Sequence, residues 1–213
     1  MKVEIWSDVV CPWCYIGKRH LEQALAAFPH RGEVEVVWRS FELDPGAPRL
    51  REEAYGPRLA RKYGVTVEAA EAMIGRMTEA GADAGLELRF DIAQPGNTFD
   101  AHRLIHLARD RGIEGAVKER LLAATFTEGR PIGDPATLVE LAGEAGLDRD
   151  EAAAVLASDT YGEAVRADEQ EAAALGTTGV PFFVIDRAYG VSGAQPPATL
   201  RHTLERAWVK AAG

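Results

Sequence analysis

The sequence predicts an α/β fold in which strands and helices from the two ends of the chain enclose a long helical middle. Residues 1–48 show a strand–helix–strand pattern, and residues 176–213 show a strand–strand–helix pattern. Residues 49–175 are rich in Ala, Glu, Arg and Leu, a composition typical of helices. We therefore predict two domains: residues 1–48 together with 176–213, and an inserted all-helical domain of residues 49–175.

The first strand and helix meet at a sharp change of period. Lys2–Trp6 alternates apolar residues, and we expect this strand to extend through Ser7–Val10. From Pro12 to Phe28 the apolar spacing is that of a helix. Proline is suited to the first turn of a helix because its missing N–H would have no partner within the helix.

A second strand follows at Glu33–Phe41 and ends at the turn residues Asp44–Pro48. Two strands joined through a helix of this length favour parallel pairing. Amphipathic spacing then predicts a series of helices in the insertion: Tyr55–Tyr63, Val67–Ala84, Asn97 or Thr98 to Arg111, Glu114–Glu128, Pro135–Ala145, Arg149–Ser158 and Asp159–Leu175. Thr66 and Asp134 are the expected N-caps of the second and fifth of these. Leu86–Phe90 alternates but has no evident partner.

Strand patterns return near the end of the chain. Phe182–Asp186 is a continuous apolar run typical of a central strand, and Arg187–Val191 is its expected hairpin partner. Ala198–Ala211 has the spacing of a last helix. The element order is therefore β-α-β, an insertion, then β-β-α.

Cys11 and Cys14 are the two cysteines of the chain and stand where the first strand gives way to the helix. Free amide groups and the positive end of the helix dipole at this point favour a thiolate at Cys11. Such a setting lowers a cysteine pKa to about 3.5–7.5, and the thiolate is the nucleophile of disulfide exchange. A CxxC pair at a strand–helix junction therefore predicts redox chemistry.

Three other interpretations of the cysteines are weaker. Two buried structural cysteines are one alternative. A structural disulfide between them would close too small a loop to stabilise much. A zinc site needs about four ligands, and the other candidates, His102 and His106, lie too far along the chain from Cys14 for an ordinary zinc module. We predict no metal.

Val180-Pro181 opens the predicted central strand. A proline here is unusual, because it has no N–H to donate to a neighbouring strand, so a special local conformation is expected. One solution is a cis bond, which would leave the Val180 backbone groups facing outward beside the cysteines, where an extended peptide could pair with them. The ordinary alternative is a trans proline at the first residue of a strand. With a CxxC pair opening the first helix, the element order is the thioredoxin layout with an insertion.

The chain resembles the DsbA-like thiol oxidoreductases, most closely their cytoplasmic FrnE-like branch. The matching segments are Ser7–Cys14, Phe41–Pro45, Asn97-Thr98 with Ala101-His102-Arg103, Gly176–Phe183 and Ser192–Pro196. The resemblance implies a thioredoxin-like core with a large helical insertion. It also implies that Cys11 attacks the substrate, that Cys14 resolves the mixed disulfide, and that Pro181 is cis.

Further site residues are expected around this pair. Pro12 and Trp13, between the two sulfurs, and Asp8, three residues before Cys11, are predicted to tune the thiol pKa and the reduction potential. The residues predicted to bind substrate are Val180, Pro181, Phe41, Asn97 and His102. Plain alternatives are a solvated or capping Asp8, a structural His102 and a core Phe41. No cofactor is predicted beyond the redox-active Cys11–Cys14 disulfide, with glutathione as a candidate co-substrate.

These features predict a thiol–disulfide oxidoreductase or isomerase acting on protein or small-molecule thiols. The alternative is a glutathione-dependent enzyme like the 2-hydroxychromene-2-carboxylate isomerases and kappa-class glutathione transferases, which are similar in architecture. Those families carry a serine in the active loop and lack the second cysteine.

Charge and hydropathy bear on partners and location. A net charge of −9 argues against nucleic acid and anionic membranes as partners, and no long apolar run predicts a membrane span. The acidic residues in Met1–Asp8 interrupt any apolar signal segment, so we expect a cytoplasmic protein. Cysteines in that compartment are more often catalytic than structural. A homodimer is left open.

Overall fold

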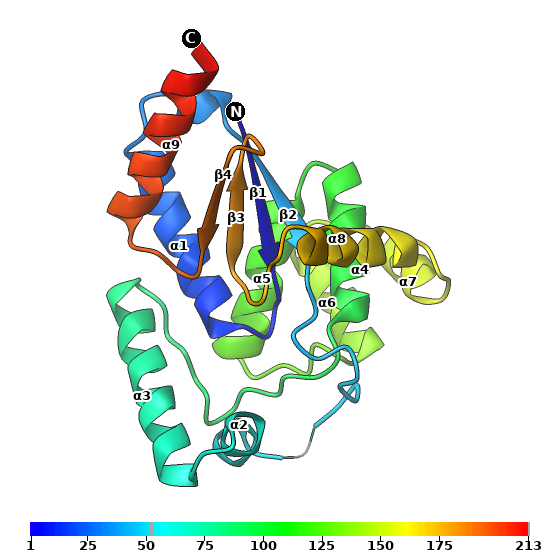
Figure 1. The fold of residues 1–213 in the computed structure, drawn as a ribbon. Coiled ribbons are helices and arrows are strands. Elements are labelled where there is room, and N and C mark those ends of the chain that lie inside the picture. The colour runs from blue at the N-terminus through cyan, green and yellow to red at the C-terminus, as the bar shows by residue number, and fades with distance from the viewer. Residues whose placement is uncertain (52, 213) are drawn as a thin grey trace.

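The computed structural model describes residues 1–51 and 53–212. A four-stranded sheet of order β2-β1-β3-β4 lies at its centre (Figure 1). The strands are Lys2–Ser7 (β1), Glu35–Ser40 (β2), Phe182–Ile185 (β3) and Tyr189–Ser192 (β4). β1 is parallel to β2, as predicted, and β3 is antiparallel to both of its neighbours.

Helices account for most of the remaining described chain, and their order confirms the α/β fold with a helical insertion. Their bounds are Pro12–Ala26 (α1), Tyr55–Tyr63 (α2), Val67–Asp83 (α3), Phe99–Asp110 (α4), Glu114–Phe126 (α5), Pro135–Glu144 (α6), Arg149–Leu156 (α7), Gly162–Ala174 (α8) and Pro197–Ala212 (α9). A short 3-10 helix, Arg31–Glu33, precedes β2. Thr66 and Asp134 cap α3 and α6 through their side chains, as predicted.

The two faces of the sheet are covered by different helices. Ile5 of β1 and Phe183 of β3 belong to one core with residues of α1 and α9, including Leu21 and Leu200. Trp6 points to the opposite face, since neighbouring side chains of a strand alternate, and it packs in a second cluster with residues that include one from α8. The Trp6 indole N–H also donates to a backbone carbonyl of α8 over 2.8 Å.

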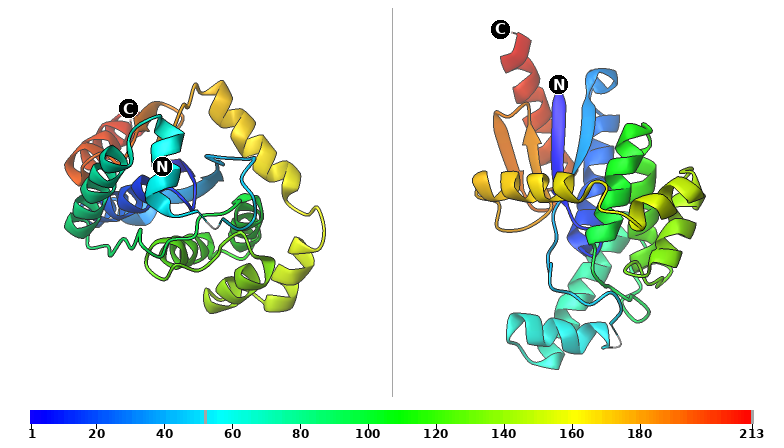
Figure 2. Two further views of the ribbon diagram at one scale, coloured as in Figure 1. Left: turned by 90° about the horizontal axis from the view of Figure 1, so that it is seen from below. Right: turned by 90° about the vertical axis from the view of Figure 1, so that its right-hand side faces the viewer.

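The hairpin α2–α3 stands apart from the other helices, beyond the end of β1 at which the first helix begins (Figures 1 and 2). It has its own core, in which Tyr55, Leu59 and Met77 are buried with Phe126 of α5. The Leu86–Phe90 segment joins this core and forms no strand. Its alternating pattern has a simple reason: Leu86, Leu88 and Phe90 are the residues of the segment that are buried against the hairpin.

The structure differs from the predictions mainly at element ends. β1 stops at Ser7, and Asp8–Val10 forms a turn in which the Cys11 N–H faces the Asp8 carbonyl at 3.4 Å. The strand does not reach Cys11 because both partner strands end beside it: Ser7 pairs with Ser40, the last residue of β2, and Trp6 pairs with Phe182, the first residue of β3. The division into two domains stays a prediction, and the main core contains residues from both predicted parts, such as Ile5 and Leu104.

Candidate active site

The two cysteines stand at the N-terminus of α1, as predicted. Cys11 is the N-cap, with extended backbone (φ −103°, ψ 112°), and Pro12 is the first helical residue. The Cys11 carbonyl accepts the N–H groups of Cys14 and Tyr15, at 3.0 and 3.3 Å, which fixes the first turn. Both cysteines are free thiols, 4% and 1% exposed respectively. Cys11 is the sulfur that faces the cleft, and Cys14 lies behind it.

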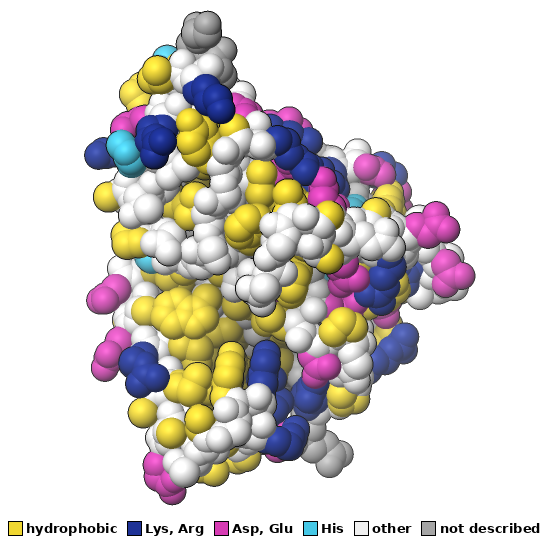
Figure 3. Space-filling model, viewed as in Figure 1, with side chains coloured by type: hydrophobic (Ala, Val, Ile, Leu, Met, Phe, Trp, Pro, Cys, Tyr) yellow, Lys and Arg dark blue, Asp and Glu magenta, His cyan; other side chains and the backbone are white. Residues whose placement is uncertain are grey.

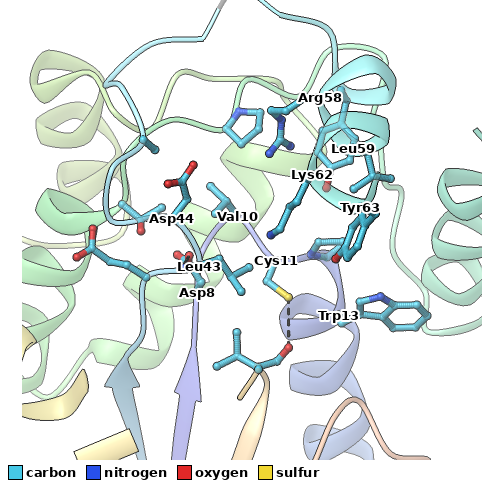
Figure 4. Close-up of a pocket in the computed structure, with 18 of the residues that line it drawn as sticks. Asp8, Val10, Cys11, Trp13, Leu43, Asp44, Arg58, Leu59, Lys62 and Tyr63 are labelled. Carbon is cyan, nitrogen blue, oxygen red and sulfur yellow. Dashed lines mark hydrogen bonds between the residues drawn. The ribbon is translucent and has the colours of Figure 1, made fainter. Parts of the chain in front are cut away.

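The loop before β3 lies directly against Cys11. The Val180–Pro181 peptide bond is cis. The Cys11 thiol donates to the Val180 carbonyl oxygen, with 3.5 Å between Sγ and O (Figure 4). Gly17 of α1 makes the close approach of the proline to the helix possible, because a Cβ at this position would lie 2.9 Å from Pro181 Cγ. The reactive thiol, the helix and the proline therefore form one packed unit.

A cleft of about 800 Å³ opens above Cys11. One wall is α2, and the opposite wall is the segment that follows β2, from Phe41 to Asp44. Trp13 is 41% exposed and lies at the cleft beside Cys11 (Figure 4). Figure 3 shows hydrophobic side chains gathered between the sheet and the α2–α3 hairpin, with Lys and Arg side chains among them. Cys11 therefore opens onto a largely apolar, partly enclosed space.

Asp8 lies fully buried at the base of the cleft. Its carboxylate accepts the Leu43 backbone N–H at 2.8 Å and faces His102 Nε2 at 3.3 Å. Burial opposes ionisation, but hydrogen bonding from His102 and Leu43 outweighs it, so the pKa of Asp8 lies below its usual value. Burial lowers the pKa of His102 despite the attraction of Asp8. Because a carboxylate only accepts, we assign the proton of His102 to Nε2.

Lys118 of α5 is fully buried beneath the cysteines and was not singled out from the sequence. Its ammonium group donates to the Ser7 carbonyl oxygen at 3.1 Å and lies 5.6 Å from the centre of the Trp38 ring. Burial lowers the pKa of Lys118 to about 8, although the charges of Cys14 and Asp8 act against this shift. The sequence does carry a signal: Lys118 lies on the same face of α5 as buried Leu122.

The two thiols titrate as a pair, and this changes the simple expectation of a thiolate at Cys11. Burial disfavours a thiolate at Cys14, but hydrogen bonding with Cys11 and the charge of Lys118 outweigh it and lower the pKa of Cys14. Hydrogen bonding to Cys14, then burial and charge repulsion, raise the pKa of Cys11. One negative charge is therefore favoured on the pair and a second is not. A thiolate on Cys11 would require a proton to cross from Cys11 to Cys14.

Glu42 adds a second buried acid to the wall of the cleft. One of its oxygens pairs with Arg166, and the other, Oε1, is buried without a hydrogen-bond partner among the residues described. Burial raises the pKa of Glu42 to about 7 despite Arg166. In the sequence, Glu42 lies in the Phe41–Pro45 segment that carries the family resemblance, but this position alone predicts no role for it.

The predicted site residues divide into two groups. Those that line the cleft are Asp8, Cys11, Pro12, Trp13, Phe41 and Val180. The sequence also predicts Asn97 and His102 in the cleft wall, and the structure places both behind it. The Asn97 side-chain amide donates to the Pro45 carbonyl at 3.2 Å and so holds the loop after β2, whereas His102 contacts Asp8. Pro181 is buried beneath Val180.

His106, on the same helix as His102, is bonded elsewhere. Its Nε2 lies 3.2 Å from Asp168 and 3.1 Å from the Ser40 hydroxyl. Within residues 1–51 and 53–212, no group of three or more His, Cys, Asp or Glu side chains is placed to hold a metal ion. No helix in the same part of the chain has the length and apolarity needed to cross a membrane.

The chain is similar to a known protein family and to several known proteins. The model of the DSBA-like thioredoxin domain family matches residues 2–205. A crystal structure of a probable DsbA oxidoreductase from Streptomyces coelicolor is 51% identical, covering 98% of this chain and 90% of that one, with a TM-score of 0.93. An uncharacterized protein of Bacillus subtilis, YwbO, is 28% identical over 86% of either chain.

More distant structures share the fold. The cytosolic disulfide reductase DsbM from Pseudomonas aeruginosa, in a structure with GSH, is 19% identical, covering 97% of this chain and 98% of that one, with a TM-score of 0.65. A 2-hydroxychromene-2-carboxylate isomerase is 15% identical, covering 100% of this chain and 98% of that one, with a TM-score of 0.73.

Proposed function

Since the chain belongs to the DSBA-like thioredoxin domain family, we propose that it is a thiol–disulfide oxidoreductase or isomerase whose redox centre is the Cys11–Cys14 pair. One observation carries the proposal. The Cys11 thiol faces an open cleft 3.5 Å from the Val180 carbonyl, with Cys14 one turn away and buried behind it. A nucleophile that faces the cleft and a resolving thiol behind it are what two-step disulfide exchange requires.

Reduction of a substrate disulfide proceeds in two exchanges. The Cys11 thiolate attacks one substrate sulfur, the substrate S–S bond breaks, and the departing thiolate takes up a proton. Cys14 then attacks the Cys11 sulfur, which releases the second substrate thiol and closes the Cys11–Cys14 disulfide. Two electrons and two protons pass from the protein to the substrate, and the oxidised protein runs the same steps in reverse on a dithiol.

The surrounding groups support each exchange. Lys118 favours the first thiolate of the pair. Attack by Cys11 then requires one proton to move from Cys11 to Cys14. The Val180 backbone offers polar groups to the chain that flanks the substrate sulfur. We propose protein or small-molecule thiols as substrates, glutathione as a co-substrate and the cytoplasm as the compartment. The FrnE-like branch within the family stays a prediction, as does a homodimer.

A glutathione-dependent isomerase or transferase is the second candidate. The cleft volume of about 800 Å³ favours it, since small-molecule sites are typically about 300–1,000 Å³. Cys14 argues against it, because a mechanism in which glutathione alone reacts needs no second sulfur behind Cys11. A variant without Cys14 therefore separates the two candidates.

The test is a pair of single substitutions in an insulin-reduction assay with mass analysis of trapped adducts. We expect Cys11→Ser to abolish turnover and form no adduct, and Cys14→Ser to abolish turnover while accumulating mixed disulfides with substrate. The second candidate would be favoured if Cys14→Ser catalysed glutathione conjugation or isomerisation at the wild-type rate. Equal residual activity in both variants would remove the proposed roles.

A further inference from the structure

The α2 wall of the cleft carries two cations that the exchange reaction itself does not use. Tyr55, Arg58, Leu59 and Lys62 follow one another at helical spacing and all line the cleft, so they form one face of α2. In Figure 4 the Arg58 and Lys62 side chains lie on the α2 side of Cys11, opposite Asp44. Each cation is within reach of a tyrosine: Arg58 lies 4.6 Å from the centre of the Tyr55 ring, and Lys62 lies 5.8 Å from that of Tyr63.

Most other charges around the cleft are paired, and the Asp8 carboxylate lies at its base, where it faces His102. Arg51 pairs with Asp44, and Arg61 pairs with Glu53. Glu42 pairs with Arg166 from outside the cleft.

Arg58 and Lys62 differ in this respect. Within the described part of the chain neither forms an ion pair with a carboxylate, and the Arg58 Nε atom is buried without a hydrogen-bond partner. The α2 wall of the cleft is therefore locally positive, although the whole chain carries a net charge of −9. An anion entering the cleft would meet both cations on one side, and the partly buried Arg58 would attract it more strongly than a fully solvated charge does.

We propose that Arg58 and Lys62 form an anion subsite that selects disulfides and thiols bearing a carboxylate close to the reacting sulfur. This inference rests on the proposed function, because the selected group is the flank of a sulfur that reacts with Cys11. The subsite orients the substrate with its carboxylate toward α2 and its sulfur toward Cys11. The tyrosine rings beside the cations and the neighbouring Leu59 accommodate the apolar atoms between the two groups.

The experiment measures oxidation of the reduced protein by three alkyl disulfides of similar size: dithiodipropionate, bis(hydroxyethyl) disulfide and cystamine. Each second-order rate constant, followed by alkylation and mass analysis, is divided by that for a free thiol to remove intrinsic reactivity. We expect the anionic disulfide to exceed the neutral one by about five-fold per cation, the factor that one charge pair at contact distance gives in water. The cationic disulfide should be slowest, and added salt should reduce the preference.

Substitutions of Arg58 and Lys62 test whether the preference for the anionic disulfide comes from the α2 wall. Arg58→Gln combined with Lys62→Gln should remove this preference, so that the normalised rates for the anionic and the neutral disulfide become equal. The matched control, Arg76→Gln with Lys210→Gln, removes two exposed cations outside the cleft and should retain it. Lys62→Glu alone, at an exposed position, brings the charge of the pair from +2 to 0 and should remove the preference even if the double variant folds poorly.

The outcomes separate this inference from the proposed function. Oxidation by all three disulfides at equal normalised rates would overturn the subsite and leave the function standing. Failure of all three to oxidise the protein would overturn both. Two matched peptide disulfides, one with Glu and one with Gln beside the cysteine, then show whether the carboxylate belongs to a protein or to a small molecule. A preference that extends to the Glu peptide points to acidic protein segments, and one confined to the small compounds points to a small-molecule disulfide.

Discussion

Replacing Gly17 by alanine places a methyl group between the first helix and the proline beside Cys11. The added Cβ would lie 2.9 Å from Pro181 Cγ and 3.4 Å from Phe183 Cζ, so the proline or the helix must move. Gly75, in the middle of α3, is a matched position because a Cβ there meets nothing within 4 Å. The same substitution at the two glycines therefore isolates the effect of the contact with Pro181.

The magnitudes follow from two opposing effects. Alanine is better than glycine inside a helix by about 0.5–1 kcal/mol, and this gain applies at both positions. Overpacking in a filled interior costs about 1–3 kcal/mol and applies only at Gly17. We therefore expect Gly75→Ala to stabilise the protein by about 0.5–1 kcal/mol. The free energy of unfolding of Gly17→Ala should be about 1–3 kcal/mol lower than that of Gly75→Ala, which corresponds to a difference in Tm of several degrees.

Urea unfolding of the reduced proteins measures the difference in stability, and the rate of Cys11 exchange with bis(hydroxyethyl) disulfide measures the consequence at the site. Displacement of Pro181 should slow exchange in Gly17→Ala and leave Gly75→Ala at the wild-type rate. A Gly17→Ala variant as stable and as reactive as Gly75→Ala would refute the packing of Pro181 against the first helix.

Two further predictions concern the buried charges. Lys118→Met should raise the pKa of the first thiol of the Cys11–Cys14 pair by about 1–3 units, because a nearby positive charge is lost, whereas Lys210→Met at an exposed position should not. Thiolate absorbance against pH measures this, and an unchanged curve in Lys118→Met would contradict it. Folding raises the pKa of Glu42 from 4.5 to about 7. As the pH rises from 4.5 to about 7, the unfolded chain loses this proton while the folded protein still holds it. The folded protein therefore loses stability over this pH range. Glu42→Gln should therefore gain up to about 3 kcal/mol relative to the wild type between pH 4 and pH 8, as measured by urea unfolding, and a difference independent of pH would argue against it.

The local parts of the fold and site were predictable because they depend on neighbouring residues. The strand–helix junction at Cys11 and the parallel pairing of β1 with β2 follow from periodicity and connection length. The hairpin predicted from Phe182–Asp186 and Arg187–Val191 is also present, with β4 at Tyr189–Ser192, and Asp186 and Arg187 in its turn have positive φ.

Features that depend on how the inserted helices pack were not predictable in the same way. Periodicity places His102 and Lys118 on their helices but does not say which face of the insertion meets the cysteines. His102 turned out to contact Asp8 behind the cleft, and Lys118 lies beneath the thiols. The end of β1 at Ser7 also depends on distant segments, since β2 ends at Ser40 opposite Ser7 and β3 begins at Phe182 opposite Trp6.

The most direct test of the redox assignment is the equilibrium of the Cys11–Cys14 pair with reduced and oxidised glutathione, read by acid quenching, alkylation and mass analysis. The account predicts a reversible two-electron transition between dithiol and disulfide, with a potential between about −270 and −120 mV, that disappears in Cys14→Ser. Absence of an internal disulfide at any glutathione ratio, with only glutathione adducts on Cys11, would contradict the assignment.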